Sequence, residues 1–405
     1  MSDAQPPLAG LRVLDLSRVL AGPWCTQQLA DLGAEVIKIE RPGRGDDTRG
    51  WGPPWLPGTR ESAYFLSANR GKRSVAIDLA DPEGQALVRQ LAAHADVLIE
   101  NFKVGGLAAY GLDHASLQAD NPGLVYCSIT GFGQDGPYAA RAGYDFLIQG
   151  MGGLMSLTGQ PDAAGGEPTK VGVALTDIFT GLYAANAILA ALRRREHDGK
   201  GAYIDMALLD VQVGVLANQA LNYLTSADVP QRLGNAHPNI VPYQAFAAAD
   251  GHLIITVGND AQFRRLCEVL SLAALADDPR FATNAARVAH RELLVAQLAA
   301  RLVERRRDDW LLALERAGVP SGPINTLDQV FDDPQVRHRG MQIERRGDDG
   351  RVARLVGNPI KLDGERLGAS GMPPRLGEHT LAVLEGWLGP GAADWEALRE
   401  RGVIG

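Results

Sequence analysis

Short apolar runs alternate with helical patterns at the start of the chain. Residues 11–16 are typical of a buried strand, residues 22–32 have the apolar spacing of a helix, and residues 34–39 form a second apolar run. Pro23 in the first turn and Gly33 after the last turn are common boundary signals of helices. The pattern predicts a first βαβ unit.

The same pattern recurs further along the chain. Residues 74–79, 96–100 and 124–129 predict strands, and a helix is expected over residues 81–91. Repeated βα units indicate an α/β fold, with a large Rossmann-like parallel sheet, helices on both faces and right-handed connections. Ligands of such sheets bind outside the carboxyl ends of the strands. In this chain those ends carry polar and glycine residues, at positions 17–21, 40–41, 100–102 and 130–133.

The first part of the chain ends with three further elements. We expect a helix over residues 177–195, a strand over residues 202–206 and a helix that runs to about residue 224. Together with the elements before them, they assign residues 1–225 to one large domain.

The pattern changes after this domain. Residues 226–325 begin with a hairpin over residues 244–257, turned at Asp250 and Gly251, and continue with helices joined by short loops. They predict a smaller α+β domain. Residues 326–405 hold short strands at 342–344 and 352–356 and a helix over 380–388, and are expected to return to the large domain.

The composition is that of an ordinary globular protein, with 405 residues of which 45% are apolar and 22% charged. The formal net charge is -8 and no polybasic tract occurs, so nucleic acid is a disfavoured partner. We find no apolar run near the ~18–20 residues that span a bilayer, and no signal-peptide pattern at the N-terminus. The sequence therefore predicts a cytoplasmic protein that does not bind membranes.

The sequence gives little support for a metal site or for disulfide bonds. Cys25, Cys127 and Cys267 lie far apart, and none of the eight histidines pairs with another at metal-ligand spacing. We interpret the cysteines as core residues and expect no metal site. The G-x-S-x-G and H-E-x-x-H signatures of hydrolases are also missing.

Gly131, Gly133 and Gly136 match the G-x-G-x-x-G pattern of dinucleotide sites and follow a predicted strand. Pro137 comes directly after them, no helix is expected at the last glycine, and the match falls late in the sheet. A tight glycine turn that lets the backbone approach a neighbour is the better interpretation.

Asp177 stands where the helix over residues 177–195 is expected to begin. Aspartate is common as a helix N-cap, and that structural role is the simpler interpretation. A helix N-terminus also stabilises negative charge, so we expect Asp177 to be ionised at neutral pH and able to attack a carbonyl group. The residue pattern by itself leaves both roles open.

Residues 38–73 are locally basic, with eight Lys or Arg against four Asp or Glu. Such a segment suits phosphate groups, although a solvated surface explains it nearly as well. It includes an irregular stretch over residues 41–57 that is rich in Gly, Pro and Trp, and long loops of this kind are often functional.

Several motifs together resemble those of the class III CoA-transferases, the family of formyl-CoA and carnitine CoA-transferases. They lie at residues 14–23, 33–43, 100–102, 128–138, 173–177 and 180–181. Within the family, residues 45–54 and 240–246 are most similar to the succinyl-CoA:glutarate (dicarboxylate) CoA-transferases.

The resemblance implies a role for particular residues. It makes Asp177 the nucleophile, and coenzyme A or an acyl-CoA is then a substrate, with no cofactor bound permanently. The CoA contacts that the motifs imply are Leu20, Ala21, Arg41, Ile77, Asn101, Phe102 and Tyr144, with Lys103 and Arg141 as phosphate contacts. Candidates for holding the second carboxylate of an acceptor acid are Arg49, Arg232 and His237. Family members form interlocked homodimers, so this chain is expected to do the same.

The mechanism implied by the resemblance passes through an anhydride and then a thioester on Asp177. Backbone N–H groups near Gly131 to Gly136 are a hypothesis for the oxyanion site. The family's glycine-run loop over the site is not found in residues 226–262, where residues 234–238 are the candidate replacement. Residues 104–110 also lack the arginine that some relatives use for CoA.

Two other functions stay open. The first is a 2-methylacyl-CoA racemase, which needs a histidine where this chain has Tyr144, a poor base at neutral pH. The second is a CoA-binding protein without catalysis, which would tolerate Asp177→Asn in every assay.

Overall fold

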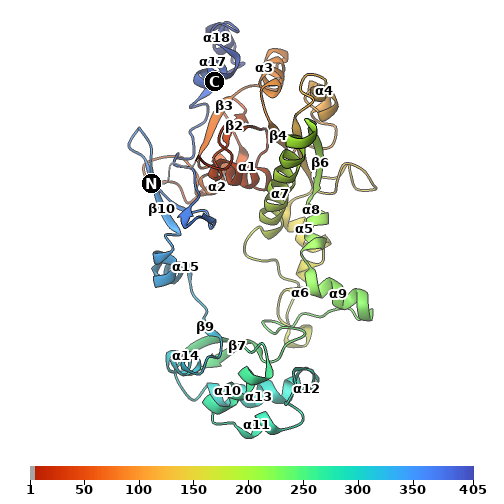
Figure 1. The fold of residues 1–405 in the computed structure, drawn as a ribbon, viewed down its shortest axis with the longest axis vertical. Helices are drawn as coiled ribbons and strands as arrows, with labels where there is room; N and C mark the ends of the chain where they lie inside the picture. Colours follow the sequence, from red (N-terminus) through yellow and green to blue (C-terminus); the bar gives the residue numbers. More distant parts are fainter. Residues whose placement is uncertain (1–4) are drawn as a thin grey trace. The chain divides into compact units, whose positions relative to one another are not determined.

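The computed structural model describes residues 5–405, which form two compact units (Figure 1). The larger unit contains the chain up to Leu154, Val171–Ala220 and Pro334–Gly405. The smaller unit contains Met155–Lys170 and Leu221–Asp333. These limits differ from the expected small domain at residues 226–325, because a segment that lies far upstream in sequence joins the unit.

The larger unit is built on a six-stranded parallel sheet in the order β3-β2-β1-β4-β5-β6. The predicted parallel sheet is therefore confirmed. The strands are β1 Arg12–Asp15, β2 Glu35–Glu40, β3 Lys72–Ala76, β4 Val97–Glu100, β5 Val125–Thr130 and β6 Ala202–Ala207. Val13 of β1 pairs with Val36 on one side and Val97 on the other. The strand order reverses between β1 and β4, and a crevice for a ligand is expected at the carboxyl ends of these two strands.

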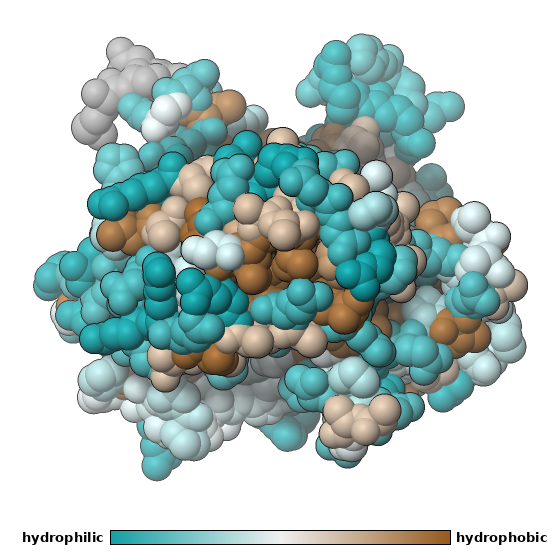
Figure 2. All heavy atoms as spheres, turned by 90° about the horizontal axis from the view of Figure 1, so that it is seen from below, coloured by the Kyte–Doolittle hydropathy of each residue, from teal (hydrophilic) through white to brown (hydrophobic). Residues whose placement is uncertain are grey.

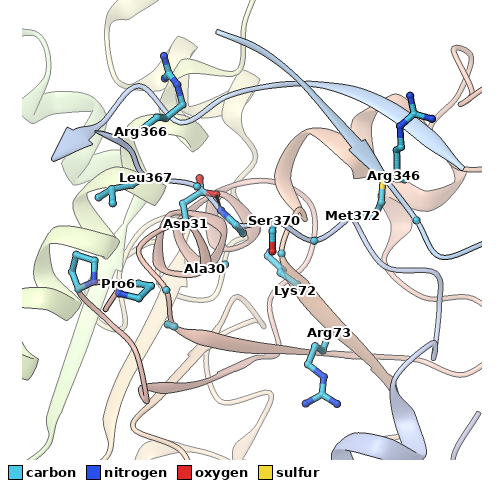
Figure 3. A pocket seen from close by; sticks show the side chains of 18 of the residues that line it. Pro6, Ala30, Asp31, Lys72, Arg73, Arg346, Arg366, Leu367, Ser370 and Met372 are labelled. Atoms are coloured by element: carbon cyan, nitrogen blue, oxygen red, sulfur yellow. Dashed lines mark hydrogen bonds between the residues drawn. The ribbon is translucent and has the colours of Figure 1, made fainter. Parts of the chain in front are cut away.

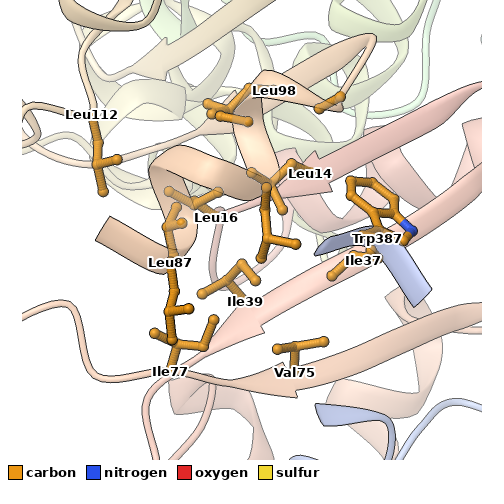
Figure 4. Close-up of a cluster of buried hydrophobic side chains, with 14 of the residues drawn as sticks. Leu14, Leu16, Ile37, Ile39, Val75, Ile77, Leu87, Leu98, Leu112 and Trp387 are labelled. Carbon is orange, nitrogen blue, oxygen red and sulfur yellow. The ribbon is translucent and has the colours of Figure 1, made fainter. Parts of the chain in front are cut away.

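Alternate residues of the strands fill two separate cores, one on each face of the sheet. Leu14 and Ile37 point into a core that contains Trp387 of α17 (Figure 4). Val13 and Val36 belong to the opposite core. Burial on both faces explains why the strands read as continuous apolar runs in the sequence.

Helices cover both faces of this sheet and the connections around it. Their bounds are α1 Ala21–Asp31, α2 Ala63–Ala68, α3 Pro82–Ala93, α4 His114–Gln118, α5 Asp145–Met151, α7 Leu175–Asp198, α8 Leu208–Gly214, α16 Pro334–His338, α17 Thr380–Leu388 and α18 Trp395–Glu400, with short 3₁₀ turns η1 Asp47–Gly50 and η2 Ala108–Tyr110. Helix α6 Leu154–Leu157 belongs to the smaller unit except for its first residue. The strand pairs β10 Gln342–Arg346 with β11 Val352–Val356 and β12 Lys361–Leu362 with β13 Glu365–Arg366 complete the unit.

Helix α7 is long and apolar enough to cross a membrane by length and composition, a possibility that the search for apolar runs missed. Its residues Ala184 and Ile188 instead lie in the core that α7 shares with α1. The two helices approach closely at Gly181, where an added Cβ would lie 2.6 Å from the carbonyl oxygen of Ala21. This packing is typical of the core helix of a globular unit.

The helix expected to run from β6 to about residue 224 is interrupted. The structure has α8 Leu208–Gly214 and then α9 Ala217–Ser226. Ala217 has a φ of 47°, a left-handed conformation that a continuous helix cannot contain. The prediction of one helix was therefore wrong.

The smaller unit combines a three-stranded antiparallel sheet with helices around one core. The sheet has the order β7-β8-β9, and Leu253, Phe263 and Trp310 are fully or almost fully buried in the core. Hydrophobic residues gather at the centre of the face seen from below, with hydrophilic residues around them (Figure 2). The bounds are η3 Asp162–Ala164, β7 Tyr243–Ala248, β8 Gly251–Thr256, α10 Asp260–Val269, α11 Ala274–Asp277, α12 Asn284–Ala289, α13 Arg291–Leu302, α14 Arg307–Arg316, β9 Ser321–Pro323 and α15 Leu327–Asp332.

Candidate active site

Asp177 is the third residue of α7 and does not cap the helix. The N-cap is Ala174, which offers no side-chain hydrogen bond. Asp145, the first residue of α5, takes over that role, since its Oδ1 accepts hydrogen bonds from the backbone N–H groups of Thr176 at 2.9 Å and Asp177 at 3.3 Å. The N-cap interpretation of Asp177 is therefore wrong, and its carboxyl group does not cap the first turn of the helix.

The ionisation of Asp177 also differs from the expectation. Burial of the carboxyl group, followed by the negative charge of Asp145, raises the pKa of Asp177 to about 7. The helix N-terminus favours the charged form, but that effect does not offset burial beside a second carboxylate. Asp177 is consequently only partly ionised at neutral pH, and the prediction of full ionisation was wrong.

Two aromatic residues that the sequence analysis overlooked lie on this side of the unit. Burial raises the pKa of Tyr64 to about 12, and the charges of Asp177 and Asp145 add to the shift. The Tyr64 ring therefore lies in the field of both carboxylates. It packs edge-on against Trp51, with 5.1 Å between ring centroids. The signal that could have found this pair was the irregular Trp-rich stretch over residues 41–57.

A cavity of about 190 Å³ lies beside Asp177 at the carboxyl ends of the strands. It brings together eight of the residues singled out from sequence, namely Leu20, Ala21, Asn101, Phe102, Lys103, Arg141, Tyr144 and Asp177. Its lining also includes Arg18, Val19 and Gly131, which the prediction did not name as contacts. The position agrees with the crevice expected where the strand order reverses.

The loops that line this cavity are fastened through their backbone atoms. Asn101 accepts a hydrogen bond from the N–H of Arg18 at 2.9 Å and donates one to its carbonyl oxygen at 2.7 Å. Buried Lys38 donates to the carbonyl oxygen of Ser17 at 2.7 Å and forms an ion pair with Asp46 at 2.9 Å. The loop after β1 is therefore held from two directions.

A second cavity of about 340 Å³ contains the remaining two predicted CoA contacts, Arg41 and Ile77. Arg18, Asp47 and Phe102 line both cavities, so the two are adjacent. The guanidinium of Arg18 lies over the Phe102 ring, 5.6 Å from its centroid, and 3.3 Å from Asp47. Arg18 thus stands at the junction of the two cavities.

Most of the basic segment over residues 38–73 is engaged in internal pairs. Lys72 is fully buried against Asp15, and Arg70 and Arg73 pair with Asp31 and Glu35. A buried cation of this kind is a structural element and is not available to a phosphate group.

The three residues considered for an acceptor carboxylate belong to two different units. Arg49 in the larger unit binds Glu40 through two hydrogen bonds, at 2.7 and 2.6 Å, and stacks on Phe65. Arg232 in the smaller unit forms an ion pair with Asp162. His237 lies in the same unit, where its Nδ1 accepts a hydrogen bond from the N–H of Asn239.

The glycine loop over residues 131–136 has no helix at its end, and α5 begins only at Asp145. Two of its amides already have partners, since Gly133 donates to Thr130 at 2.9 Å and Gln134 donates to Asp205 at 3.0 Å. These two groups are not free to bind an oxyanion. Gly131 lies against Gly143, where an added Cβ would come within 2.5 Å, so the glycine serves close backbone packing.

The largest cavity described, of about 850 Å³, lies at the amino ends of β2 and β3 and does not include Asp177 (Figure 3). Acidic residues such as Asp31 and Glu378 line it together with basic residues such as Arg73 and Arg346. In residues 5–405 no group of three or more His, Cys, Asp or Glu side chains is arranged to hold a metal ion.

The parallel sheet and the cavity at its reversal point define a doubly wound α/β protein with a carboxylate in its ligand crevice. The model of CoA-transferase family III matches residues 8–380, and the chain belongs to that family. A succinate–glutarate CoA-transferase of Agrobacterium fabrum is 54% identical over 95% of this chain and 96% of its own length. The succinyl-CoA:glutarate CoA-transferase of Mus musculus is 46% identical over 99% of this chain and 91% of its own.

A solved structure supports the same fold and family. A CAIB/BAIF family protein from Brucella suis superposes with a TM-score of 0.83 at 55% identity, covering 95% of this chain and 100% of that one. The fold and the family recognised from the motifs are thus confirmed together.

Proposed function

We propose that the protein transfers coenzyme A from succinyl-CoA to a dicarboxylic acid, with glutarate as the first acceptor to test. The printed activities of the Agrobacterium and mouse relatives support this choice of substrates. The single observation that carries the proposal is that Asp177 lines the same cavity as Asn101, Phe102 and the other residues of the CoA motifs.

In the first half-reaction, the Asp177 carboxylate attacks the thioester carbonyl carbon of succinyl-CoA. The carbon–sulfur bond breaks, which gives a mixed anhydride of succinate and Asp177 and releases CoA as a thiolate. The thiolate then attacks the Asp177 carbonyl carbon, and the anhydride carbon–oxygen bond breaks. Succinate leaves, and Asp177 carries CoA as a thioester.

The second half-reaction reverses these steps with the acceptor. A carboxylate of the acceptor attacks the aspartyl thioester, forming a new anhydride and freeing the thiolate once more. Attack of the thiolate on the acceptor's carbonyl carbon yields the acceptor's CoA ester and restores the Asp177 carboxylate. No proton is gained or lost over the cycle, so an acid–base pair is not required.

The surroundings of Asp177 suit these steps. Asp145 holds the start of α7 through the N–H groups of Thr176 and Asp177, which keeps the nucleophile in one position. The pKa of about 7 makes the Asp177 carboxylate more basic than an exposed aspartate, and basicity favours nucleophilic attack.

The two adjacent cavities suit a long ligand with different ends. We assign the thiol end of CoA to the cavity beside Asp177 and its nucleotide end to the larger one. Arg41 and Arg44 line the larger cavity, are exposed, and make no ion pair among the described residues. Two cations without carboxylate partners provide the charge that phosphate groups need.

The proposal is tested by trapping the intermediate. The enzyme is mixed with succinyl-CoA in the absence of acceptor and quenched with hydroxylamine, which converts an aspartyl thioester or anhydride to a hydroxamate. Peptide mass spectrometry is expected to find the hydroxamate on Asp177. The variant D177N is expected to bind CoA without forming it, and D210N, an exposed aspartate at the start of α8, is expected to label like the wild type.

Absence of the modified peptide in the wild type, or its presence in D177N, would contradict the mechanism. A parallel screen of glutarate against monocarboxylic acids as acceptors tests the substrate class. A preference for monocarboxylic acids would contradict the dicarboxylate assignment while leaving the mechanism intact.

We also propose that the protein acts as a homodimer. The family resemblance supports it, and so do large apolar side chains left exposed near Asp177, among them Phe146 at 58% and Val173 at 58%. Sedimentation analysis is expected to give twice the chain mass, and a monomer at assay concentration would contradict the proposal.

A further inference from the structure

Glu100 is a buried carboxylate that the mechanism does not use. It is the last residue of β4 and only 5% exposed. Across residues 5–405 no lysine, arginine or histidine lies within ion-pair distance of it. Burying an unpaired carboxylate is costly, so a residue of this kind calls for a specific reason.

The carboxylate of Glu100 holds the loop that follows its own strand. It accepts a hydrogen bond from the backbone N–H of Phe102 at 2.7 Å. Phe102 and Asn101 line the cavity beside Asp177, and Asn101 is in turn bound to both backbone groups of Arg18. The loop after β1 therefore depends on the loop after β4, which Glu100 anchors.

A side-chain network extends from Glu100 to the next loop. The hydroxyl of Ser128 on β5 forms a hydrogen bond with Glu100 and accepts one from the side-chain amide of Gln134 at 2.8 Å. The backbone N–H of Gln134 is bound to Asp205 of β6 at 3.0 Å. Glu100 thus connects the loops after β4 and β5, which both border the cavity.

We propose that Glu100 is a positioning residue for coenzyme A, which in its ionised form holds the loop of Asn101 and Phe102 in the CoA-binding arrangement and releases it when protonated. The inference rests on the proposed function, because it takes CoA to be the ligand of this cavity. Its consequence is a CoA affinity that rises with pH through the neutral range.

The electrostatics of the surroundings agree with this role. Burial raises the pKa of Glu100 to about 7, although its hydrogen bonds with Ser128 and Phe102 lower it. The titratable groups on its face of the sheet are Tyr126 of β5 and Tyr203 and Asp205 of β6, and Cys127 of β5 lies on the opposite face. Burial raises the pKa of Tyr126, Cys127 and Tyr203, so these three groups stay neutral while Glu100 titrates.

Neighbouring ionisable groups do not reverse the effect. Burial lowers the pKa of His114, whose ring centroid lies 5.7 Å from that of Tyr126. This histidine is therefore neutral at any pH above the ordinary pKa of a histidine side chain. The bond from the Phe102 N–H to an ionised carboxylate is stronger than a bond to a protonated one. Ionisation of Glu100 therefore tightens the loop, and protonation weakens it.

The test measures the Kd of free CoA by calorimetry in a D177N background, with and without E100Q. Measurements run from about pH 5.5 to about pH 8.5, which brackets the midpoint of Glu100. We expect E100Q to weaken CoA binding about fivefold at the upper end, where a charge-assisted hydrogen bond is lost, and to have no effect at the lower end. Comparison at equal pH cancels the titration of the CoA phosphates.

Two further variants separate positioning from folding. E196Q, at an exposed glutamate of α7, is expected to keep the parent profile at every pH. S128A removes a hydrogen bond that lowers the pKa of Glu100, so the midpoint of the Kd profile is expected to move to higher pH. This shift tests the network even where E100Q fails to fold.

Equal CoA affinity of E100Q and its parent at every pH would overturn the inference, as would a loss that is the same at all pH values. An unchanged midpoint in S128A would overturn it as well. A parent that binds no CoA at any pH would overturn the proposed function, whereas a parent that binds CoA without this pH dependence would overturn only the role of Glu100.

Discussion

The carboxylate of Asp145 accepts a hydrogen bond from the backbone N–H of Asp177 at 3.3 Å, so one aspartate fixes the position of another. The same oxygen accepts the N–H of Thr176 at 2.9 Å, and the second oxygen accepts the side-chain amide of Gln149 at 2.7 Å. Asp145 therefore has two effects on Asp177: it orders the first turn of α7, and its charge raises the pKa of the Asp177 carboxyl group.

Replacing Asp145 by Asn removes the charge and keeps an acceptor oxygen. The pKa of Asp177 is expected to fall from about 7, because the second cause of its upward shift is gone. The active form is the ionised one, so the acidic limb of the kcat/KM profile moves to lower pH. An unchanged profile would contradict the coupling, and D120N, at an exposed aspartate paired with Arg89, serves as the control.

Replacing Asn101 by Ala removes both hydrogen bonds to the backbone of Arg18. The loop after β1 then loses part of its support, and the KM for succinyl-CoA is expected to rise about thirtyfold, since two hydrogen bonds at ~1 kcal/mol each contribute ~2 kcal/mol. The kcat at saturation should change much less. A fall in kcat at unchanged KM would mean that Asn101 acts on the reaction and not on the loop.

Lys38 and Asp46 form an ion pair in which both side chains are completely buried. Lys38→Met leaves Asp46 without its counter-charge, and the free energy of unfolding in urea is expected to drop by ~3–5 kcal/mol. The matched control is Arg193→Met, which breaks an exposed pair with Glu196 and should cost at most ~1 kcal/mol. Equal losses in the two variants would contradict the importance of burial.

The same pair contributes to stability in a pH-dependent way. Burial raises the pKa of Asp46, but Lys38 and Thr48 outweigh it and lower the pKa to about 2 from the ordinary 3.8. A lowered folded-state pKa stabilises the protein above the unfolded value, and that contribution is lost as pH falls from about 4 towards about 2. Thermal unfolding across this pH range should show a smaller loss of stability in D46N than in the wild type, after correction for the lower starting stability of D46N.

Gly181 permits the close approach of α7 to α1. A Cβ there would lie 2.6 Å from the carbonyl oxygen of Ala21 and 3.1 Å from Cβ of Trp24, so Gly181→Ala is expected to destabilise the fold by ~1–3 kcal/mol. Gly214, the last residue of α8, has open space at the same position. Gly214→Ala should therefore leave the urea midpoint unchanged or raise it slightly, and a similar loss in both variants would contradict the steric explanation.

The parallel sheet could be predicted because burial on both faces produces apolar runs, and the helix over Thr380–Leu388 was placed correctly from its spacing. Interactions between distant residues could not. Asp145 binds the start of α7 across 31 residues, and the partners of Lys38 and Lys72 come from separate loops and strands. Local sequence patterns do not show such pairs. The basic residues of segment 38–73 therefore looked available to phosphate groups, although most of them form ion pairs within the protein.

The site residues show the same contrast between local sequence patterns and contacts of distant residues. Motifs identified most of the residues around Asp177, whereas the contacts of Arg18, Tyr64 and Trp51 followed only from the structure. The ionisation of Asp177 was predicted wrongly for a related reason. The helix N-terminus, which favours the charged form, is visible in the sequence, whereas the burial that raises the pKa depends on the whole fold.

The loops around the cavity are fastened at main-chain atoms: Asn101 binds the peptide groups of Arg18, and Glu100 binds the amide of Phe102. Peptide groups are the same whatever side chain they carry. The side chains at Val19 and Val104 can therefore be exchanged without dismantling the walls of the cavity, which makes them the positions at which a new preference for acids could be introduced by directed evolution.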